Sequence, residues 1–286
     1  MSSMKKLFLI PILLMGVLFA GNVNAQVQDD IYAKEHVPNR KPIPYKFLRE
    51  ADAMYKKRVW RVIDLREKIN LNLYYPTEPI GQERKSLIDL LLWGISTEGL
   101  TAYNTEDDRF TQPMSRTQIE QNFGAVETTI NTFDEDGNEV PVTIKGEIKS
   151  SEVKQYWLKE DWFFDRQHST MEVRIIGLSP IRFYVKDDGG SDEDAEPRKS
   201  MTFWIYFPEV RRILANHEVF NNNNDAERRT FDDIFFKRYF NSFIVKVSNV
   251  YDDRGISEYS LGIQSLLEAE ALKKQITDFE QDLWEY

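Results

Sequence analysis

Cysteine is absent from this 286-residue chain, and histidine occurs only three times. Without cysteine the protein has no disulfide bond, no thiol nucleophile and no cysteine-ligated zinc or iron–sulfur site. His36, His168 and His217 each lack a second histidine two or four residues away, so the sequence does not predict a zinc site. The GxxxxGK[ST] and GxGxxG loops that hold phosphate groups are also missing. We therefore expect no cofactor and no metal.

The chain also lacks a surplus of positive charge. Its formal net charge is −10, from 37 lysines and arginines against 47 acidic residues. A balance of this sign argues against general binding to nucleic acid or to anionic membranes. We expect neutral or basic partners instead.

Only one long apolar run is present, and it lies at the amino terminus. Leu7–Ala20 follows Lys5 and Lys6 and precedes the small residues of Val23-Asn24-Ala25, so residues 1–25 read as a cleaved signal peptide. The run is about 14 residues long, short of the roughly 20 that cross a bilayer. A retained anchor is the alternative. Because a chain without cysteine cannot carry a lipid at the cleavage site, we expect any membrane attachment to come through a partner.

The segment after the signal peptide is rich in proline and polar residues. Residues 26–45 end in "VPNRKPIPY" and predict an extended linker, which leaves residues 46–286 as one folded domain. From Phe47 to Ile69 the apolar residues fall on one side of a helical wheel, so we expect a helix there. Arg58 lies inside this apolar arc and needs a carboxylate or carbonyl partner if buried. Trp60 points to nearly the opposite side.

In the rest of the domain, helices and strands come in blocks and do not alternate strictly. We expect helices at 85–95, 115–122 with Ser115 as the N-cap, and 262–284, and a helix running into a strand over 230–247. We expect a β-hairpin from 128–133 and 139–145 around "DEDGN", a strand at 171–185 bent at 177–180, and a strand at 201–207. Elements in blocks favour an α+β fold, with mixed helices, antiparallel β-hairpins and a long C-terminal helix.

Two short acidic stretches invite a reading as ion sites. "TFDEDGNEV" lacks the acids that a calcium loop needs at its first and last ligand positions, so we read it as the hairpin turn. The loop Asp187–Glu196 could hold calcium weakly, or could be a solvated acidic loop. The sequence leaves its role open.

The stretch "LKEDWFFDRQHSTMEVRIIGLSPI" is the one place where enzyme chemistry is conceivable. Two of Glu160, Asp161 and Asp165 could act as the acid and base of a glycoside hydrolase, with the nearby aromatics as a sugar platform. A peptidoglycan-binding protein that uses Asp161 and Asp165 is the related possibility. His168 next to Ser169 does not by itself make a triad. The alternative is that the acids pair with Lys159 and Arg166 while the aromatics fill a core. We favour this structural reading and expect no catalytic residue.

Aromatic and arginine side chains on charged elements suggest protein–protein contacts. Such side chains supply most of the binding energy in interfaces. The candidate partner-contact residues are Lys56, Lys57, Trp60, Arg61, Arg174 and Arg182.

Three blocks together carry a family resemblance: "VWRVIDLREKINLNLYYP", "KEDWFFDRQHSTMEVRIIGLSPI" and "FWIYFPEVR". Over nearly the whole mature chain the sequence resembles the GldN/PorN family of the Bacteroidetes type IX secretion system and gliding motility apparatus. The resemblance implies a non-enzymatic periplasmic subunit at the inner face of the outer membrane. It implies a ring formed with a GldK/PorK-like lipoprotein, and contact with a GldM/PorM-like motor protein. The family offers no catalytic motif to transfer.

Overall fold

The computed structural model describes residues 31, 36–78, 80, 84–125, 128–133, 139–144, 146–185, 197–221, 224 and 226–282. The predicted signal peptide and the hydrophobic run within it lie outside these residues, as does the acidic loop Asp187–Glu196. Of the predicted linker, Ile31 and residues 36–45 are described. The boundary at residue 45 stays a prediction, and the compact unit of the chain runs from His36 to Tyr286.

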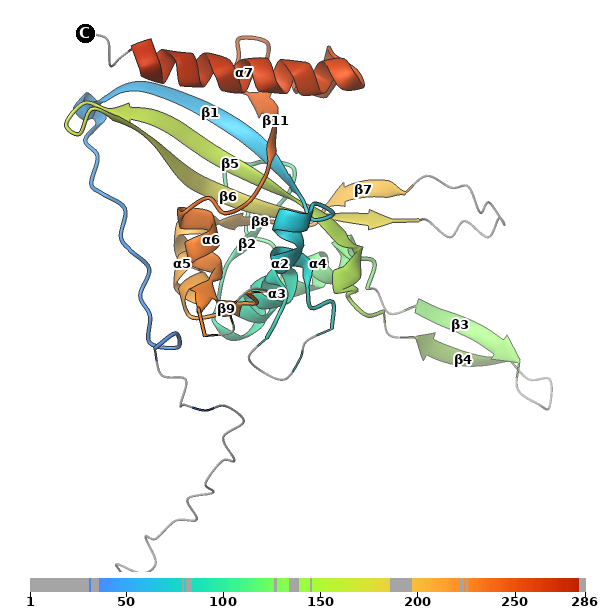
Figure 1. Ribbon diagram of the computed structural model, residues 1–286. Helices are drawn as coiled ribbons and strands as arrows, with labels where there is room; N and C mark the ends of the chain where they lie inside the picture. The colour runs from blue at the N-terminus through green and yellow to red at the C-terminus, as the bar shows by residue number, and fades with distance from the viewer. Residues whose placement is uncertain are drawn as a thin grey trace, which may run out of the picture. The chain divides into compact units, whose positions relative to one another are not determined.

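The described elements are helices and antiparallel strands grouped in blocks, which confirms the α+β prediction (Figure 1). The strands are β1 (Ala53–Asp64), β2 (Ala102–Tyr103), β3 (Thr128–Phe133), β4 (Glu139–Ile144), β5 (Val153–Asp165), β6 (Thr170–Tyr184), β7 (Arg198–Met201), β8 (Trp204–Tyr206), β9 (Glu218–Val219), β10 (Arg229–Thr230) and β11 (Phe243–Val247). The helices are α2 (Leu71–Tyr74), α3 (Leu87–Thr97), α4 (Arg116–Asn122), α5 (Phe207–Ala215), α6 (Phe231–Phe236) and α7 (Ile263–Asp282).

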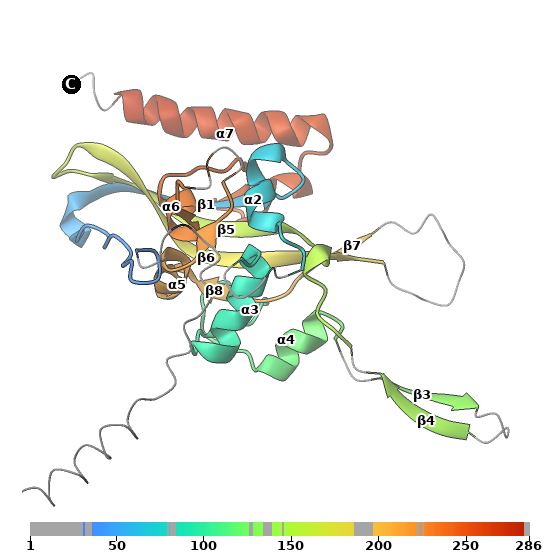
Figure 2. The same cartoon turned by 60° about the horizontal axis from the view of Figure 1, so that its bottom comes forward.

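Seven of the described strands form one antiparallel sheet. Its order is β11-β1-β5-β6-β8-β2, and β7 pairs with β6 off this path. The long strands β1, β5 and β6 run side by side (Figure 1). In both views the α7 helix lies on one side of these strands, and α3 and α5 lie on the opposite side (Figures 1 and 2).

Two apolar clusters hold the helices to the sheet. The larger one joins Tyr156 and Leu158 of β5 to α3, α5 and α6, and includes Leu90, Leu214 and Phe235. The smaller one joins Val59 of β1 and Val247 of β11 to Ala269 and Ile276 of α7. Because only Ala269 and Ile276 of α7 are buried, this helix is held by much less apolar contact than α3 or α5.

The predicted helix from Phe47 to Ile69 is wrong, because Ala53–Asp64 is strand β1. The side chains of Phe47, Met54 and Ile69, which would have lined its apolar stripe, are exposed. Every residue from Val59 to Asp64 is buried, since β5 and β11 flank this part of β1 and the two apolar clusters cover it, with Val59 in the smaller cluster and Ile63 in the larger one. Charged residues on a strand covered in this way break the simple alternation that identifies strands.

Several other predictions hold. The helices at α3, α4 and α7 are present, and Ser115 forms a capping box with Gln118 at the start of α4. The β3–β4 hairpin and the α6-to-β11 connection are present as well. In β6, the register against β5 shifts beside Gly177, within the predicted bend.

The stretch from Trp157 to Asp165, for which no element was predicted, belongs to strand β5, which pairs with both β1 and β6. One predicted strand differs in detail. The predicted strand 201–207 contains the last residue of β7, Met201, and the whole of β8, and Phe207 already begins α5. Pro208 in the first turn of α5 explains this stop, because proline suits the start of a helix.

Candidate interaction surface

The two lysines among the nominated contacts lie on opposite faces of β1. The side chain of Lys56 is 54% exposed and forms an ion pair with Asp161, with 2.9 Å between Nζ and Oδ2. Lys57 is half-buried and lines a groove beside α7. Both lie at the surface, so their contact with a partner stays a prediction.

Trp60 and Arg61 are buried within the chain itself. Trp60 is 3% exposed and its Nε1 donates to Asp108 Oδ2 at 2.8 Å. Arg61 is 7% exposed and donates to the side chain and carbonyl of Ser242. Burial lowers the pKa of Arg61. With β1 a strand, the helical-wheel reason for naming Trp60 no longer holds, and both residues hold the sheet to its neighbouring loops.

Lys159 completes the environment of Trp60. Its Nζ donates to the carbonyl oxygen of Asp108 at 2.6 Å and lies 3.2 Å from the Asp108 carboxylate. The same ammonium lies 5.4 Å from the ring centroid of Phe110. Burial lowers the pKa of Lys159, while Asp108 opposes that shift. The loop through Asp108 and Phe110 therefore covers this part of the sheet with its own counter-charge.

Arg174 holds the segment that precedes β1. It donates to the carbonyl of Lys46 at 2.5 Å, and its guanidinium lies 5.4 Å from the ring centroid of Tyr45. On its other side Tyr45 meets Arg211, 4.4 Å from the ring centroid. Burial raises the pKa of Tyr45. Arg174 is thus a contact within the chain, and Tyr45 lies between two guanidinium groups.

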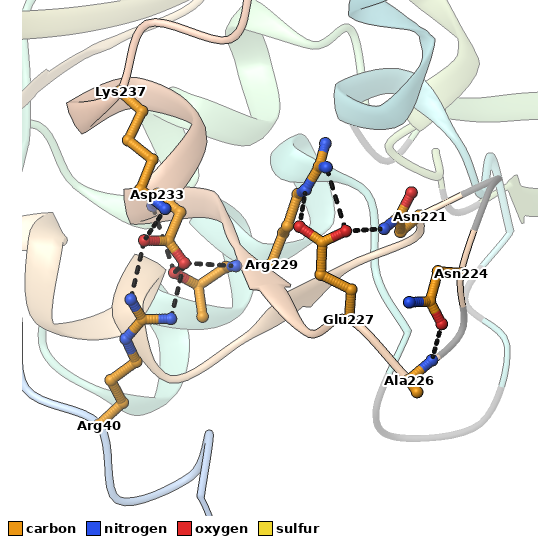
Figure 3. A network of polar contacts seen from close by, with 9 residues as sticks. Arg40, Asn221, Asn224, Ala226, Glu227, Arg229, Asp233 and Lys237 are labelled. Carbon is orange, nitrogen blue, oxygen red and sulfur yellow. Dashed lines mark hydrogen bonds and ion pairs between the residues drawn. The ribbon is translucent and has the colours of Figure 1, made fainter.

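A second anchor holds the same segment at Arg40 (Figure 3). Arg40 makes two hydrogen bonds to Asp233 of α6, at 2.6 and 2.8 Å. Asp233 also accepts from the backbone N–H of Thr230, which completes a capping box at the start of α6. Lys237 lies 3.8 Å from the same carboxylate. The sequence indicated an extended segment here, but nothing in its pattern identified the partners of Arg40 and Tyr45.

Arg182, the last candidate partner-contact residue, also makes its contacts within the chain. It forms an ion pair with Glu152 and donates to the carbonyl of Asn122, and only 14% of its side chain is exposed. Its guanidinium lies 4.5 Å from the ring centroid of Tyr184. It connects β6 to the last residue of α4 and to Glu152, just before β5.

The acids of β5 are all paired. Asp161 accepts two hydrogen bonds from Arg58, at 2.7 and 3.0 Å, which is the partner that Arg58 was expected to need. Burial alone would raise the pKa of Asp161. The hydrogen bonds from Arg58 and Lys56 outweigh the effect of burial, so the pKa lies below its ordinary value. Asp165 lies 2.5 Å from His168 Nδ1, and this contact lowers its pKa.

Glu160 is fully buried and equally well satisfied. It accepts from Arg238 Nη1 at 2.9 Å and from Trp162 Nε1 at 3.0 Å. Asp161 and Asp165 lie four residues apart on one strand, so about 13 Å separates their backbones at 3.3 Å per residue. Glycoside hydrolases place their two carboxyl groups about 5 to 9.5 Å apart.

The described residues offer little for metal or membrane chemistry. No group of three or more acidic or histidine side chains within them could hold a metal ion. Across the same residues, no helix has both the length and the apolar character needed to span a bilayer.

An exposed apolar surface surrounds the start of α7, and the sequence reasoning did not identify it. Leu261, Ile263, Leu266 and Leu267 are 80%, 78%, 56% and 65% exposed. Leu266 also lines a groove of about 360 Å³, whose other lining side chains include Val62, Trp157, Ile181, Met201 and Phe243. Ile263, Leu266 and Leu267 do not fall on the helix face that carries the buried residues Ala269 and Ile276. Apolar residues off the buried face were a signal available in the sequence.

The chain matches the family model described as gliding motility associated protein GldN over residues 48–285. None of the curated proteins compared with the chain matches it. The match covers both apolar clusters and every strand of the main sheet. The chain therefore belongs to the GldN family and is a gliding motility protein.

Proposed function

We propose that this chain is a non-enzymatic structural subunit of the type IX secretion and gliding machinery. The proposal places it in the periplasm after removal of a signal peptide, at the inner face of the outer membrane. There it forms a ring with a GldK/PorK-like lipoprotein and contacts a GldM/PorM-like motor protein. A closed ring needs two different, complementary surfaces on each subunit.

The observation that carries the proposal is the exposed apolar surface at the start of α7. Single exposed apolar residues are common, but four large ones within seven residues, next to an apolar groove, are typical of a protein contact. The net charge of −10 is enough to keep a monomer soluble. Solubility therefore gives no reason for an exposed apolar surface, whereas a protein contact does. A surface of this kind favours a subunit over a freely diffusing enzyme.

Co-purification from cross-linked cells tests the proposal. We expect the tagged chain to recover the lipoprotein and the motor protein, and Leu266→Asp with Leu267→Asp to lose at least one of them. Phe47→Asp is a matched control, because Phe47 is 86% exposed and lies outside this surface. Recovery of wild-type protein without either partner would contradict the proposed function. Full recovery by the double variant would exclude the start of α7 as the contact.

Glycan hydrolysis or binding with Asp161 and Asp165 is the alternative function. A general acid must hold its proton near neutral pH, whereas both carboxyl groups have lowered pKa values and are already paired, Asp161 with Arg58 and Lys56 and Asp165 with His168. Incubation of the purified protein with peptidoglycan separates the two functions. We expect no turnover by the wild type, and turnover that Asp161→Asn or Asp165→Asn abolishes would establish the alternative.

A further inference from the structure

Strand β1 has two strand neighbours along only part of its length. β5 pairs with it from Ala53 to Asp64, whereas β11 pairs with it from Val59 to Val62. Among the residues that the structure describes, no strand pairs with the β11 side of residues 53–57. This half of β1 is therefore an open sheet edge, which can take up a further strand.

The backbone of Lys56 points toward this open edge. Ser248 N–H donates to the carbonyl oxygen of Arg58 at 3.0 Å, so the Arg58 carbonyl faces the β11 side. The register of β1 against β5 is unbroken from Tyr55 to Asp64. Since the backbone groups of a strand alternate between its two sides, the N–H and C=O of Lys56 face the same side as those of Arg58.

A groove of about 730 Å³ lies beside this half of the strand. It begins where β11 ends, at Val247 and Ser248, and continues past Tyr55 and Lys57 of β1. Leu272 and Phe279 of α7 form its apolar wall. The ring of Tyr55 lies 4.3 Å from that of Phe279, so α7 contacts β1 through side chains of one face. An extended chain continuing the row of β11 would pass through this groove.

Two lysines line this groove without forming an ion pair within the described part of the chain. Lys57 is half-buried and Lys274 lies on α7, and neither forms an ion pair or a side-chain hydrogen bond with any described residue. Asp278 and Asp282 also line the groove but form no ion pair with either lysine. A partly desolvated ammonium group gains from a carboxylate supplied by the occupant.

We propose that an extended, acidic segment of a partner protein binds this groove and adds to β1 as a strand beside Lys56. Main-chain hydrogen bonds to Lys56 supply affinity, and pairing of an acidic side chain with Lys57 and Lys274 supplies selectivity. The occupant rests on the proposed function, because it is a segment of one of the two envelope partners. The open edge and the groove are properties of this chain alone.

Proline at residue 56 tests the strand addition. Lys56→Pro removes the outward N–H, and an edge position tolerates proline because that N–H makes no bond to β5. Lys56→Ala is the control, since it removes the same side chain and its ion pair with Asp161 but keeps the N–H. Binding of the purified full-length variants to the soluble parts of the lipoprotein and the motor protein is measured by calorimetry. We expect Lys56→Pro to weaken one partner at least tenfold and Lys56→Ala to weaken it less than threefold.

Two further measurements keep the test decisive if Lys56→Pro does not fold. Lys57→Glu reverses the charge in the groove and should weaken the same partner at least tenfold. Amide hydrogen exchange at Lys56 in the wild-type protein should slow by at least tenfold in the complex. If a partner binds but Lys56 stays unprotected and Lys57→Glu binds like wild type, the strand addition is wrong and the proposed function stands. If neither partner binds the wild type, both proposals fail.

Discussion

At the scale of single residues, this protein uses its charges to hold segments together. Arg211 and Asp232 form an ion pair with side chains 5% and 9% exposed, and Arg238 satisfies the buried Glu160. The sequence showed that Arg58 needed a partner but could not show which acid supplies it. That pairing depends on the register between β1 and β5, and the residues involved lie 103 positions apart in the chain.

Asp64 should make stability depend on pH. Hydrogen bonds from Arg66 lower its pKa from 3.8 to about 2. Because the folded pKa lies below the unfolded one, the ionised carboxylate stabilises the fold above about pH 4, and this contribution is lost as the pH falls toward about 2. We expect Asp64→Asn to lower the free energy of unfolding at pH 7 by about 1 kcal/mol, a modest loss because the Arg66 side chain is 68% exposed and water screens the pair.

Urea unfolding at pH 7 and below pH 3 checks this prediction. The difference between wild type and Asp64→Asn should shrink at the lower pH. Asp278→Asn, an exposed acid of α7, is the control and should change stability little. A difference between wild type and Asp64→Asn that does not vary with pH would contradict the assignment to this carboxylate.

At the scale of elements, the sequence predicted the elements with a single dominant pattern. α3 and α4 follow their N-caps Ser86 and Ser115, and the β3–β4 hairpin follows its turn residues. β1 could not be predicted in the same way, because its buried half carries two charged residues: Arg61 bonds to Ser242 just before β11, and Asp64 bonds to Arg66 and to Gln155 of β5. Its apolar residues then imitate a helical spacing. Tertiary contacts decided its structure.

Gly177 should be required for the close approach of the Phe110 loop to β6. A Cβ added there would lie 2.6 Å from Phe110 Cζ and 3.2 Å from Trp204 Cε3. We expect Gly177→Ala to cost about 1–3 kcal/mol, as overpacking of a core does. Thermal unfolding measures the effect. Gly255→Ala is the control, because its nearest neighbours would lie at 3.5 Å, and an equal loss from both variants would contradict the steric explanation.

At the scale of the whole molecule, residues 36–46 join the folded domain through a few side chains. Val37 is buried, Arg40 binds Asp233, and Tyr45 lies between Arg174 and Arg211. The family and the α+β class were accessible from the sequence. The burial of Trp60 and Arg61 was not, because it depends on the folded arrangement, whereas the apolar residues from Leu261 to Leu267 left a signal in the sequence that the helix prediction did not use.

Tyr45→Ala should release this segment. Loss of the ring between the two guanidinium groups removes its packing, so amide hydrogen exchange of residues 40–46 should accelerate at least fivefold while the sheet stays protected. Phe47→Ala is the control, because its side chain is 86% exposed in the same segment. Equal acceleration in both variants would show that Tyr45 does not anchor the segment.

The central claim is that this chain works by assembling with its neighbours. Sedimentation of gently solubilised cell envelopes on a density gradient, followed by detection of the chain and of the lipoprotein, tests it most directly. We expect both proteins to migrate together in a particle many times larger than the 33.7 kDa chain. Migration of the chain as a free monomer, apart from the lipoprotein, would contradict the claim.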